Sequence, residues 1–180
     1  MARNLTKLPH NLDAKKRTCS AIIETPKGHR SKYDYDPKLG IFCLKSLLPD
    51  GQAFPLDFGF VPSTLCDDGD PLDVMVLADE PGITGAHVQV RLIGVIEVEE
   101  VAKGKRERND RLLGVSALSH LYAKVNNVED LEPDFVTNLE LFWAHKAKQD
   151  RKAFKIVGVG KPGEAVKAVK ASARTAKRSR

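Results

Sequence analysis

The most informative segment of this chain is Cys66–Val76, which has the sequence C-D-D-G-D-P-L-D-V-M-V. Three carboxylates, Asp68, Asp70 and Asp73, lie close together, and an apolar run follows directly at positions 74–78. Carboxylates repel one another, so gathering them at the start of a buried strand costs free energy unless a cation offsets the repulsion. Because hard divalent cations such as Mg²⁺ prefer carboxylate and water oxygens, the stretch predicts a metal-binding loop before a buried strand.

A solvated acidic turn is the alternative interpretation of the same residues. Asp, Gly and Pro are ordinary turn residues, and an isolated D-x-D is more often such a turn than a metal site. Gly69 permits a tight turn and Pro71 fixes one backbone angle, so this loop can also be stiff. The complete D-G-D-P-L-D-V segment is longer and more constrained than a generic turn, which favours the metal site.

Length and composition indicate one globular domain. The chain has 180 residues, of which 42% are hydrophobic and 29% charged. No apolar run approaches the roughly 20 residues of a membrane span, and the first residues lack the apolar core of a secretory signal. Its cysteines, Cys19, Cys43 and Cys66, are scattered and form no C-x-x-C pair. This usage predicts neither a disulfide framework nor a zinc site, and the reducing cytoplasm is the simplest compartment.

The net charge of +5 is concentrated at the C-terminus. Residues 161–180 carry seven Lys and Arg against Glu164 alone, a net charge of +6 that leaves about −1 for the rest. Such a tail can contact nucleic acid or an acidic partner, but it is more often a solvated helix or a frayed end. We therefore divide the chain into an N-terminal arm (1–17), a barrel domain (18–160) and a basic C-terminal helix or tail (161–180).

Short apolar segments separated by turns predict a β-rich fold. The segments 31–36 and 41–44 fit a hairpin, 54–62 reads as a bent strand, and Gly94 fits a bulge within a long strand. Positions 103–111 read as a charged loop, and strands linked by loops rather than helices suggest a closed antiparallel barrel. The other expected strands are 18–24, 74–77, 88–98, 112–115 and 155–159.

Two helices are expected, both in the C-terminal half. Residues 131–149 place apolar side chains at three- and four-residue steps, with Pro133 suited to a first helical turn. Residues 164–177 are rich in Ala and Lys, and Val166 and Val169 would form a narrow docking stripe.

Four other groups of residues are candidates for binding phosphate. Glu24 ends a strand, and alternation puts Lys32 and Asp34 on one strand face, although exposed Lys and Asp are also common on surface hairpins. The remaining groups each have an ordinary alternative: a solvated loop, a helix surface or core packing. They are Glu99-Glu100 with Asn109-Asp110-Arg111, His145-Lys146, and the aromatic residues Phe54, Phe58 and Phe60.

Taken together, these segments resemble the soluble (family I) inorganic pyrophosphatases. The similarity extends from about Cys19 to about Val157, and its strongest part is the segment 68–74. Supporting matches are Glu24, Lys32-Tyr33, Gly40, Pro55, Gly59, Gly94-Val95 and Lys146.

The resemblance implies a mainly β (α+β) fold, a five-stranded OB-like closed barrel with two flanking helices in the C-terminal half. It implies Mg²⁺-dependent hydrolysis of pyrophosphate to two phosphates by a metal-bound water, with Mn²⁺ as an alternative ion, in a homo-oligomer, either a hexamer or a dimer. Asp70 would be a metal ligand and would also accept the proton of that water. The other implied metal ligands are Asp68, Asp73, Glu24, Asp34, Glu100 and Asp110, and the implied phosphate ligands are Lys32, Arg111, Lys146, Ser46 and His145.

Several positions depart from the family pattern. Ser46 falls where a phosphate-binding Arg is expected, and strand alternation would point the neighbouring Lys45 to the other face. Asn109 falls where a bridging Asp is expected, so a one-residue shift would make Asp110 the ligand. A phosphohydrolase with another substrate, or an OB-like binding module with a basic tail, is therefore an alternative. The further departures are Asp34 for Glu, Phe58 for Tyr, Glu100 for Asp, Arg111 for Lys and His145 for Tyr.

Overall fold

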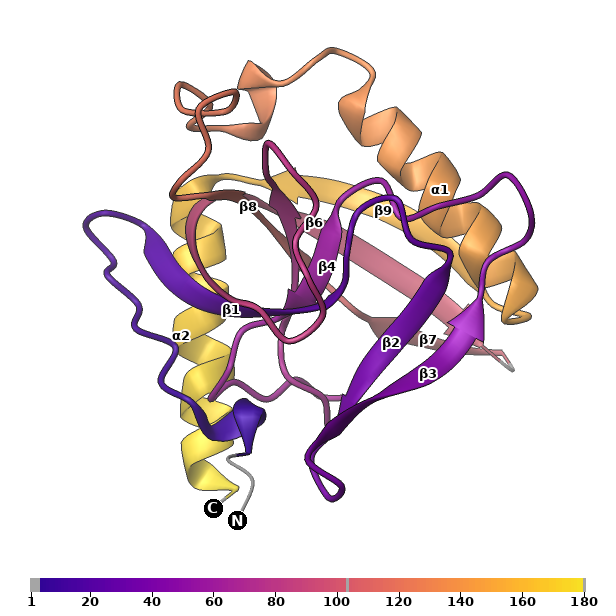
Figure 1. Cartoon of the computed structure of the whole chain (residues 1–180), viewed down its shortest axis with the longest axis horizontal. Coiled ribbons are helices and arrows are strands. Elements are labelled where there is room, and N and C mark those ends of the chain that lie inside the picture. The colour runs from indigo at the N-terminus through magenta and orange to yellow at the C-terminus, as the bar shows by residue number, and fades with distance from the viewer. Residues whose placement is uncertain (1–3, 103, 180) are drawn as a thin grey trace.

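The computed structural model describes residues 4–102 and 104–179, and strands make up most of its regular structure (Figure 1). Its elements, in chain order, are η1 Leu5–Lys7, β1 Thr18–Thr25, β2 Ser31–Asp36, β3 Ile41–Leu47, β4 Asp57–Phe60, β5 Asp73–Leu77, β6 His87–Ala102, β7 Lys105–Arg108, β8 Arg111–Ser116, η2 Val128–Asp130, α1 Phe135–Gln149, β9 Ala153–Gly160 and α2 Pro162–Arg178.

Five strands pair in a closed ring. β1 pairs with β4, β4 with β5, β5 with β8, β8 with β6, and β6 returns to β1. This ring, with two α-helices in the C-terminal half, confirms the predicted OB-like fold class. The expectation of a wholly antiparallel ring was wrong at one pairing, since β5 and β8 are parallel. The chain runs back along β6 before it enters β8, so β8 has the same direction as β5.

Both faces of the ring are buried, which explains the continuous apolar runs of its strands. In β5, Val74 and Val76 belong to a cluster that includes α2, while Met75 and Leu77 belong to a cluster that includes α1. Successive strand residues point to opposite faces, so one apolar strand supplies both clusters. The predicted bulge at Gly94 is confirmed, because the β6–β8 register shifts between Leu92 and Gly94.

The two helices cover different sides of the ring (Figure 1). α1 begins at Phe135, so the expected start near residue 131 was too early and Pro133 lies in the preceding turn. α2 buries the expected stripe of Val166 and Val169 together with Ala165. Within residues 4–102 and 104–179, no helix is long and apolar enough to cross a membrane.

The charged segment after β6 is a hairpin rather than the expected loop. β6 continues to Ala102 and pairs with β7, whose four residues are all exposed. Long charged side chains suit a two-stranded ribbon in solvent, where cross-strand ion pairs such as Arg106–Glu99 (3.2 Å) support the pairing. Lys103, which was part of the predicted loop, lies outside the described residues.

Candidate active site

A large cavity of about 1150 Å³ lies between hairpin β2–β3, the ring and helix α1. Residues far apart in sequence form its walls, because strand pairing brings the ends of β1, β5, β6 and β8 together beside the hairpin. The predicted site residues that line it are Glu24, Lys32, Asp34, Ser46, Asp68, Asp70, Asp73, Glu100, Arg111 and Lys146.

Two predicted site residues are not among the described residues that line the cavity. The Asp110 carboxylate accepts a hydrogen bond from the Val98 backbone N–H (3.0 Å) and contacts the Arg108 guanidinium (3.1 Å). His145 is exposed on α1, where its Nδ1 contacts the side-chain amide of Gln52. Asn109 lines the cavity, and the roles of Asp110 and His145 stay predictions without geometric support.

The acidic loop, residues 67–73, lines the cavity and is held in a tight local conformation. Gly69 has a φ of +91°, which favours glycine, and the Asp68 carboxylate accepts a hydrogen bond from the Asp70 backbone N–H (3.0 Å). The Cys66 N–H donates to the Asp70 carbonyl (2.8 Å), which closes the turn. Asp73 follows as the first residue of β5, so Asp68 and Asp70 are exposed while Asp73 lies deeper.

Burial disfavours the ionised form of two carboxyl groups of the acidic loop, Asp73 and Asp70. Burial raises the pKa of Asp73 to about 6, although Arg111 and Lys32 oppose this shift. Burial also raises the pKa of Asp70, and the neighbouring charges of Asp68 and Asp34 act in the same direction. A raised carboxyl pKa means that the ionised form is disfavoured without an additional cation.

Glu24 is the most strongly affected carboxyl group of the cavity. Only 8% of the residue is exposed, and its Oε1 accepts a hydrogen bond from the Tyr35 backbone N–H (2.8 Å). Burial raises its pKa to about 8; the Tyr35 hydrogen bond opposes the shift, and the charge of Asp34 adds to it. Glu24 is therefore a buried acid whose ionised form is disfavoured by its surroundings.

Arg111 has buried nitrogen atoms that lack a hydrogen-bond partner. Its Nη2 donates to Glu100 Oε1 (2.8 Å), and its Nε lies 3.5 Å from Asp73 Oδ2. Its Cζ lies 4.1 Å from the ring centroid of Trp143, which holds the guanidinium plane in a fixed orientation. Within the described residues, Nε and Nη1 of Arg111 are buried without a hydrogen-bond partner. Nη1 is thus a fixed donor on the wall of the cavity, suited to an anionic oxygen.

Lys32 and Lys146 supply two further cations that are largely buried. Lys32 pairs with Asp34 on the same strand, and its side chain is 18% exposed. Lys146 pairs with Asp150 one helical turn later (2.7 Å), and its side chain is 11% exposed. Both therefore lie in the cavity as expected, on elements from opposite ends of the sequence.

Lys152 is a cavity residue that the sequence analysis missed. Its Nζ lies 3.2 Å from Glu100 Oε2, on the side of that carboxylate away from Arg111. Burial opposes ionisation of Glu100, but Arg111 and Lys152 outweigh it and hold its pKa below the usual range. No local pattern marks Lys152; its position follows from the pairing of β9 with β6.

Lys45 also lines the cavity, which corrects the expectation that it would point to the other strand face. Lys32 pairs with Ser46 and Tyr33 pairs with Leu44, so Lys45 is the extra residue of a β-bulge. A bulge interrupts alternation and redirects a side chain. Both Lys45 and Ser46 therefore reach the cavity.

The aromatic residues are core rather than a stacking platform. Phe54, Phe58 and Phe60 are each less than 5% exposed. Phe58 contacts Trp143, with 5.2 Å between ring centroids, and both border the cavity as its apolar floor. The floor limits the access of water from below and supports the ring on which Arg111 lies.

The carboxylate oxygens of the cavity are the kind of ligand that hard divalent cations prefer. The carboxylates of the acidic loop and of Glu24 offer oxygen ligands, and burial raises the pKa values of Glu24, Asp70 and Asp73, so a nearby cation would favour their ionised forms. Across the described residues, no three His, Cys, Asp or Glu side chains form a group close enough to hold a metal ion. The carboxylates thus supply suitable ligands but not a preassembled cage.

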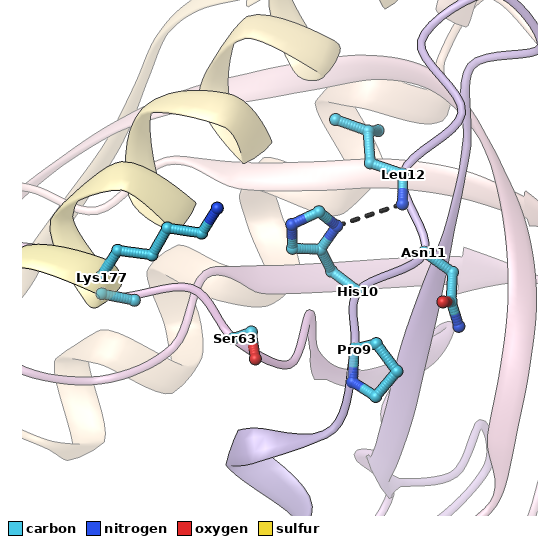
Figure 2. Close-up of a pocket in the computed structure, with 7 residues that line it drawn as sticks. Pro9, His10, Asn11, Leu12, Ser63 and Lys177 are labelled. Carbon is cyan, nitrogen blue, oxygen red and sulfur yellow. Dashed lines mark hydrogen bonds between the residues drawn. The ribbon is translucent and has the colours of Figure 1, made fainter. Parts of the chain in front are cut away.

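A second, smaller cavity of about 390 Å³ lies between the N-terminal arm and the end of α2 (Figure 2). His10 Nδ1 accepts a hydrogen bond from the Leu12 backbone N–H (3.1 Å). Burial lowers the pKa of His10, and the charge of Lys177 lowers it further. None of the described residues that line this cavity carries a carboxylate, whereas the large cavity combines acidic and basic walls. The large cavity is therefore the candidate active site.

Comparison with known proteins relates the whole domain to one family. A family model described as inorganic pyrophosphatase matches residues 21–177. The inorganic pyrophosphatase of Thermus thermophilus is 35% identical over 150 residues, covering 83% of this chain and 83% of that protein. Soluble inorganic pyrophosphatase 5 of Arabidopsis thaliana is 29% identical over 153 residues, covering 85% of this chain and 69% of that protein.

Solved structures lead to the same family. The crystal structure of the inorganic pyrophosphatase from Thermus thermophilus has a TM-score of 0.87 and 31% identity, covering 97% of this chain and 99% of that chain. That from Neisseria gonorrhoeae has a TM-score of 0.86 and 27% identity, covering 96% of this chain and 99% of that chain. Since the family model spans most of the sequence and the relatives match in both sequence and fold, this chain belongs to the inorganic pyrophosphatase family.

Proposed function

We propose that this protein hydrolyses inorganic pyrophosphate to two phosphates in a Mg²⁺-dependent reaction by direct attack of water. The observation that carries the proposal is a single cavity in which the carboxylates of the acidic loop stand beside buried Lys and Arg side chains. A bare carboxylate wall would repel pyrophosphate, and a purely basic wall would not attract a metal. The combination suits a metal complex of a polyanion.

The carboxylates of the acidic loop and of Glu24 and Asp34 would hold Mg²⁺, with Mn²⁺ as an alternative ion. When bound, such an ion screens the substrate's negative charge and lowers the pKa of the attacking water. Asp70 takes the proton of that water, since it lines the cavity and partial burial of its carboxyl group raises its pKa. A raised pKa brings a carboxylate nearer to neutral pH, where it is a better general base.

The basic residues bind and orient the two phosphoryl groups. Arg111 offers the unpaired Nη1 from a fixed plane, and Lys32 and Lys146 add flexible ammonium groups. Charge on the leaving phosphate develops in a region where burial weakens solvent screening, so each of these contacts counts for more than in water. Phe58 and Trp143 form the apolar floor that excludes water from that side.

Phosphate release from pyrophosphate, measured with Mg²⁺ and again with Mn²⁺, tests the proposal. Asp70→Asn should lower kcat at least about a hundredfold, because it removes the proton acceptor while keeping the size of the side chain. Asp50→Asn is the matched control, since Asp50 is 94% exposed and pairs with Arg30 outside the cavity. An Asp70→Asn enzyme with wild-type turnover would refute the mechanism, and wild-type protein without turnover would refute the function.

The composition of the cavity also predicts a preference for pyrophosphate over other phosphate substrates. Nucleotides, polyphosphate and phosphate esters should be poorer substrates if the carboxylate and basic walls are matched to two phosphoryl groups. A comparison of kcat/KM across these compounds decides the matter, and a clear preference for one of them would favour the alternative phosphohydrolase.

We further propose that the protein is a homo-oligomer. Leu44 and Leu47 of β3 are 56% and 61% exposed and are not part of the cavity lining, and two such exposed leucines on one short strand suit an interface. Sedimentation velocity measures the mass of the assembly, and a monomer at micromolar concentration would contradict the proposal.

We place the reaction in the cytoplasm. Cys19, Cys43 and Cys66 are free thiols, and Cys19 is buried in the core. Free thiols fit a reducing compartment.

A further inference from the structure

Lys45 owes its position to a local irregularity of hairpin β2–β3. In the register of this hairpin, Lys32 is opposite Ser46 and the next residue, Tyr33, is opposite Leu44. Lys45 therefore has no partner across the ladder, and the bulge places it beside Ser46 on the lining of the cavity. Bulges near functional sites often redirect a side chain in this way.

Lys45 differs in its freedom from Lys32 and Lys146, the two lysines of the predicted site that line the cavity. Its side chain is 69% exposed, and its Nζ lies 3.9 Å from Asp34 Oδ2, at the limit of an ion pair. Lys32 and Lys146, in contrast, are 18% and 11% exposed and hold their partners closely. A lysine on a flexible stem with a weak partner can turn toward an incoming anion at little cost.

The surroundings of Lys45 leave its ammonium group available to a ligand of the cavity. Asp34 already pairs with Lys32, so it does not require the second ammonium group. The side chain of Ser46, next to Lys45, adds a hydroxyl to the same stretch of wall. Asp34, Lys45 and Ser46 thus form a polar patch on the hairpin, and they line the same cavity as the acidic loop.

We propose that Lys45 is a substrate-binding residue. Its ammonium group contacts the phosphoryl group of the diphosphate that lies nearer to solvent. This inference rests on the proposed function, and it goes further by assigning a phosphate contact to a residue that strand alternation would put on the other face. Because the side chain is exposed at the entrance, the contact forms on binding and changes little during the reaction. Its loss should therefore raise KM and leave kcat nearly unchanged.

The experiment compares Lys45→Gln with wild-type protein in the presence of Mg²⁺. Binding of methylenediphosphonate, which cannot be hydrolysed, is measured by calorimetry beside steady-state hydrolysis of pyrophosphate. We expect Kd and KM to rise about tenfold, which corresponds to about 1.4 kcal/mol. Lys155→Gln removes the same charge from an exposed position of β9 outside the cavity and should change neither constant.

A rescue variant separates a phosphate contact from a structural effect. Lys45→Gln combined with Ser46→Arg returns a cation to the same wall through the adjacent residue, so Kd and KM should return toward wild-type values. Unchanged constants in Lys45→Gln, with a wild-type enzyme that binds and hydrolyses, would overturn this inference alone. Wild-type protein that neither binds the diphosphonate nor hydrolyses pyrophosphate would overturn the proposed function and this inference with it.

Discussion

The guanidinium group of Arg111 lies over the indole ring of Trp143, with 4.1 Å between Cζ and the ring centroid. The same Cζ lies 5.1 Å from the ring centroid of Phe154. Two aromatic rings, one from α1 and one from β9, therefore orient the guanidinium group of Arg111, the first residue of β8. Glu100 then fixes one end of the fork through Nη2 (2.8 Å). The orientation of the remaining nitrogen atoms is determined by packing, before any substrate binds.

Arg111→Lys should lower kcat/KM for pyrophosphate about a hundredfold. Lysine keeps the positive charge but loses both the fork and the stacked orientation, which a compact ammonium group cannot reproduce. Steady-state kinetics with Mg²⁺ measure the loss. The control is Arg174→Lys, which changes an exposed Arg of α2 that does not line the cavity. An equal loss in both variants would show that the fixed orientation of Arg111 is unimportant.

Glu24→Gln should flatten the dependence of stability on pH in metal-free protein. The pKa of Glu24 rises from 4.5 to about 8 on folding because of burial, so the folded state binds more protons between these values. The free energy of unfolding therefore falls as the pH rises from about 4.5 to 8. Gln keeps an acceptor for the Tyr35 N–H and cannot ionise.

Urea unfolding between pH 5 and 9 in EDTA measures this effect. Wild-type protein should lose stability across the range, and Glu24→Gln should lose clearly less. Asp73, whose pKa is about 6, still contributes below pH 6 in both proteins. Added Mg²⁺ should stabilise wild-type protein more at pH 8 than at pH 5, because protons compete with the metal. Parallel pH profiles of the two proteins would contradict the assignment of Glu24.

Gly59→Ala should destabilise the ring by about 3 kcal/mol or more. A Cβ at this position would lie 2.8 Å from the Ile22 carbonyl carbon, which belongs to the paired strand β1 and cannot move independently. Gly163→Ala is the matched control, because nothing lies within 4 Å of its added Cβ on α2. That control should stabilise the protein by about 0.5–1 kcal/mol through the helix preference of alanine. Comparable melting temperatures of the two variants would refute this account.

The two faces of helix α2 should contribute very differently to the free energy of unfolding. Substitutions on its buried face should be costly, and substitutions on its charged, exposed face should not. Val169→Asp should lower the free energy of unfolding by several kcal/mol, since Val169 is fully buried in the cluster between α2 and the ring. Replacing Lys167, Lys170 and Arg174 together by Gln should change it by less than about 0.5 kcal/mol, because all three are exposed. The same triple variant tests nucleic-acid contact: salt-sensitive binding by wild-type protein that the variant loses would support the binding-module alternative.

Local patterns predicted most of the secondary structure. Alternation and apolar runs located β1, β5, β6 and β8, because the polarity of consecutive residues shows which faces of a strand are buried. The same reasoning missed β7, whose residues are charged and exposed, since a ribbon in solvent needs no apolar face. It also began α1 four residues early, at Leu131 instead of Phe135, because Pro133 suits both a first turn and the preceding loop.

The candidate site divides in the same way. Asp68, Asp70 and Asp73 are neighbours in the sequence, so their meeting at one loop required no knowledge of the fold. Lys152 and Glu100 are 52 residues apart, and only the pairing of β9 with β6 brings them within 3.2 Å. Asp110 and Asn109 could not be told apart by spacing; the turn into β8 directs Asn109 to the cavity and Asp110 to the Val98 amide.

By itself, the sequence determined the strand and helix periods, the acidic loop and the family, because each depends on short-range pattern or on residue identity. The tertiary structure decided which charged side chains share the cavity. Lys45 is the clearest case, since one unpaired residue in the β2–β3 register moves its ammonium group from the expected outer face to the wall beside Asp34. Register and bulges are set by contacts between strands, and such contacts leave no local signal in the chain.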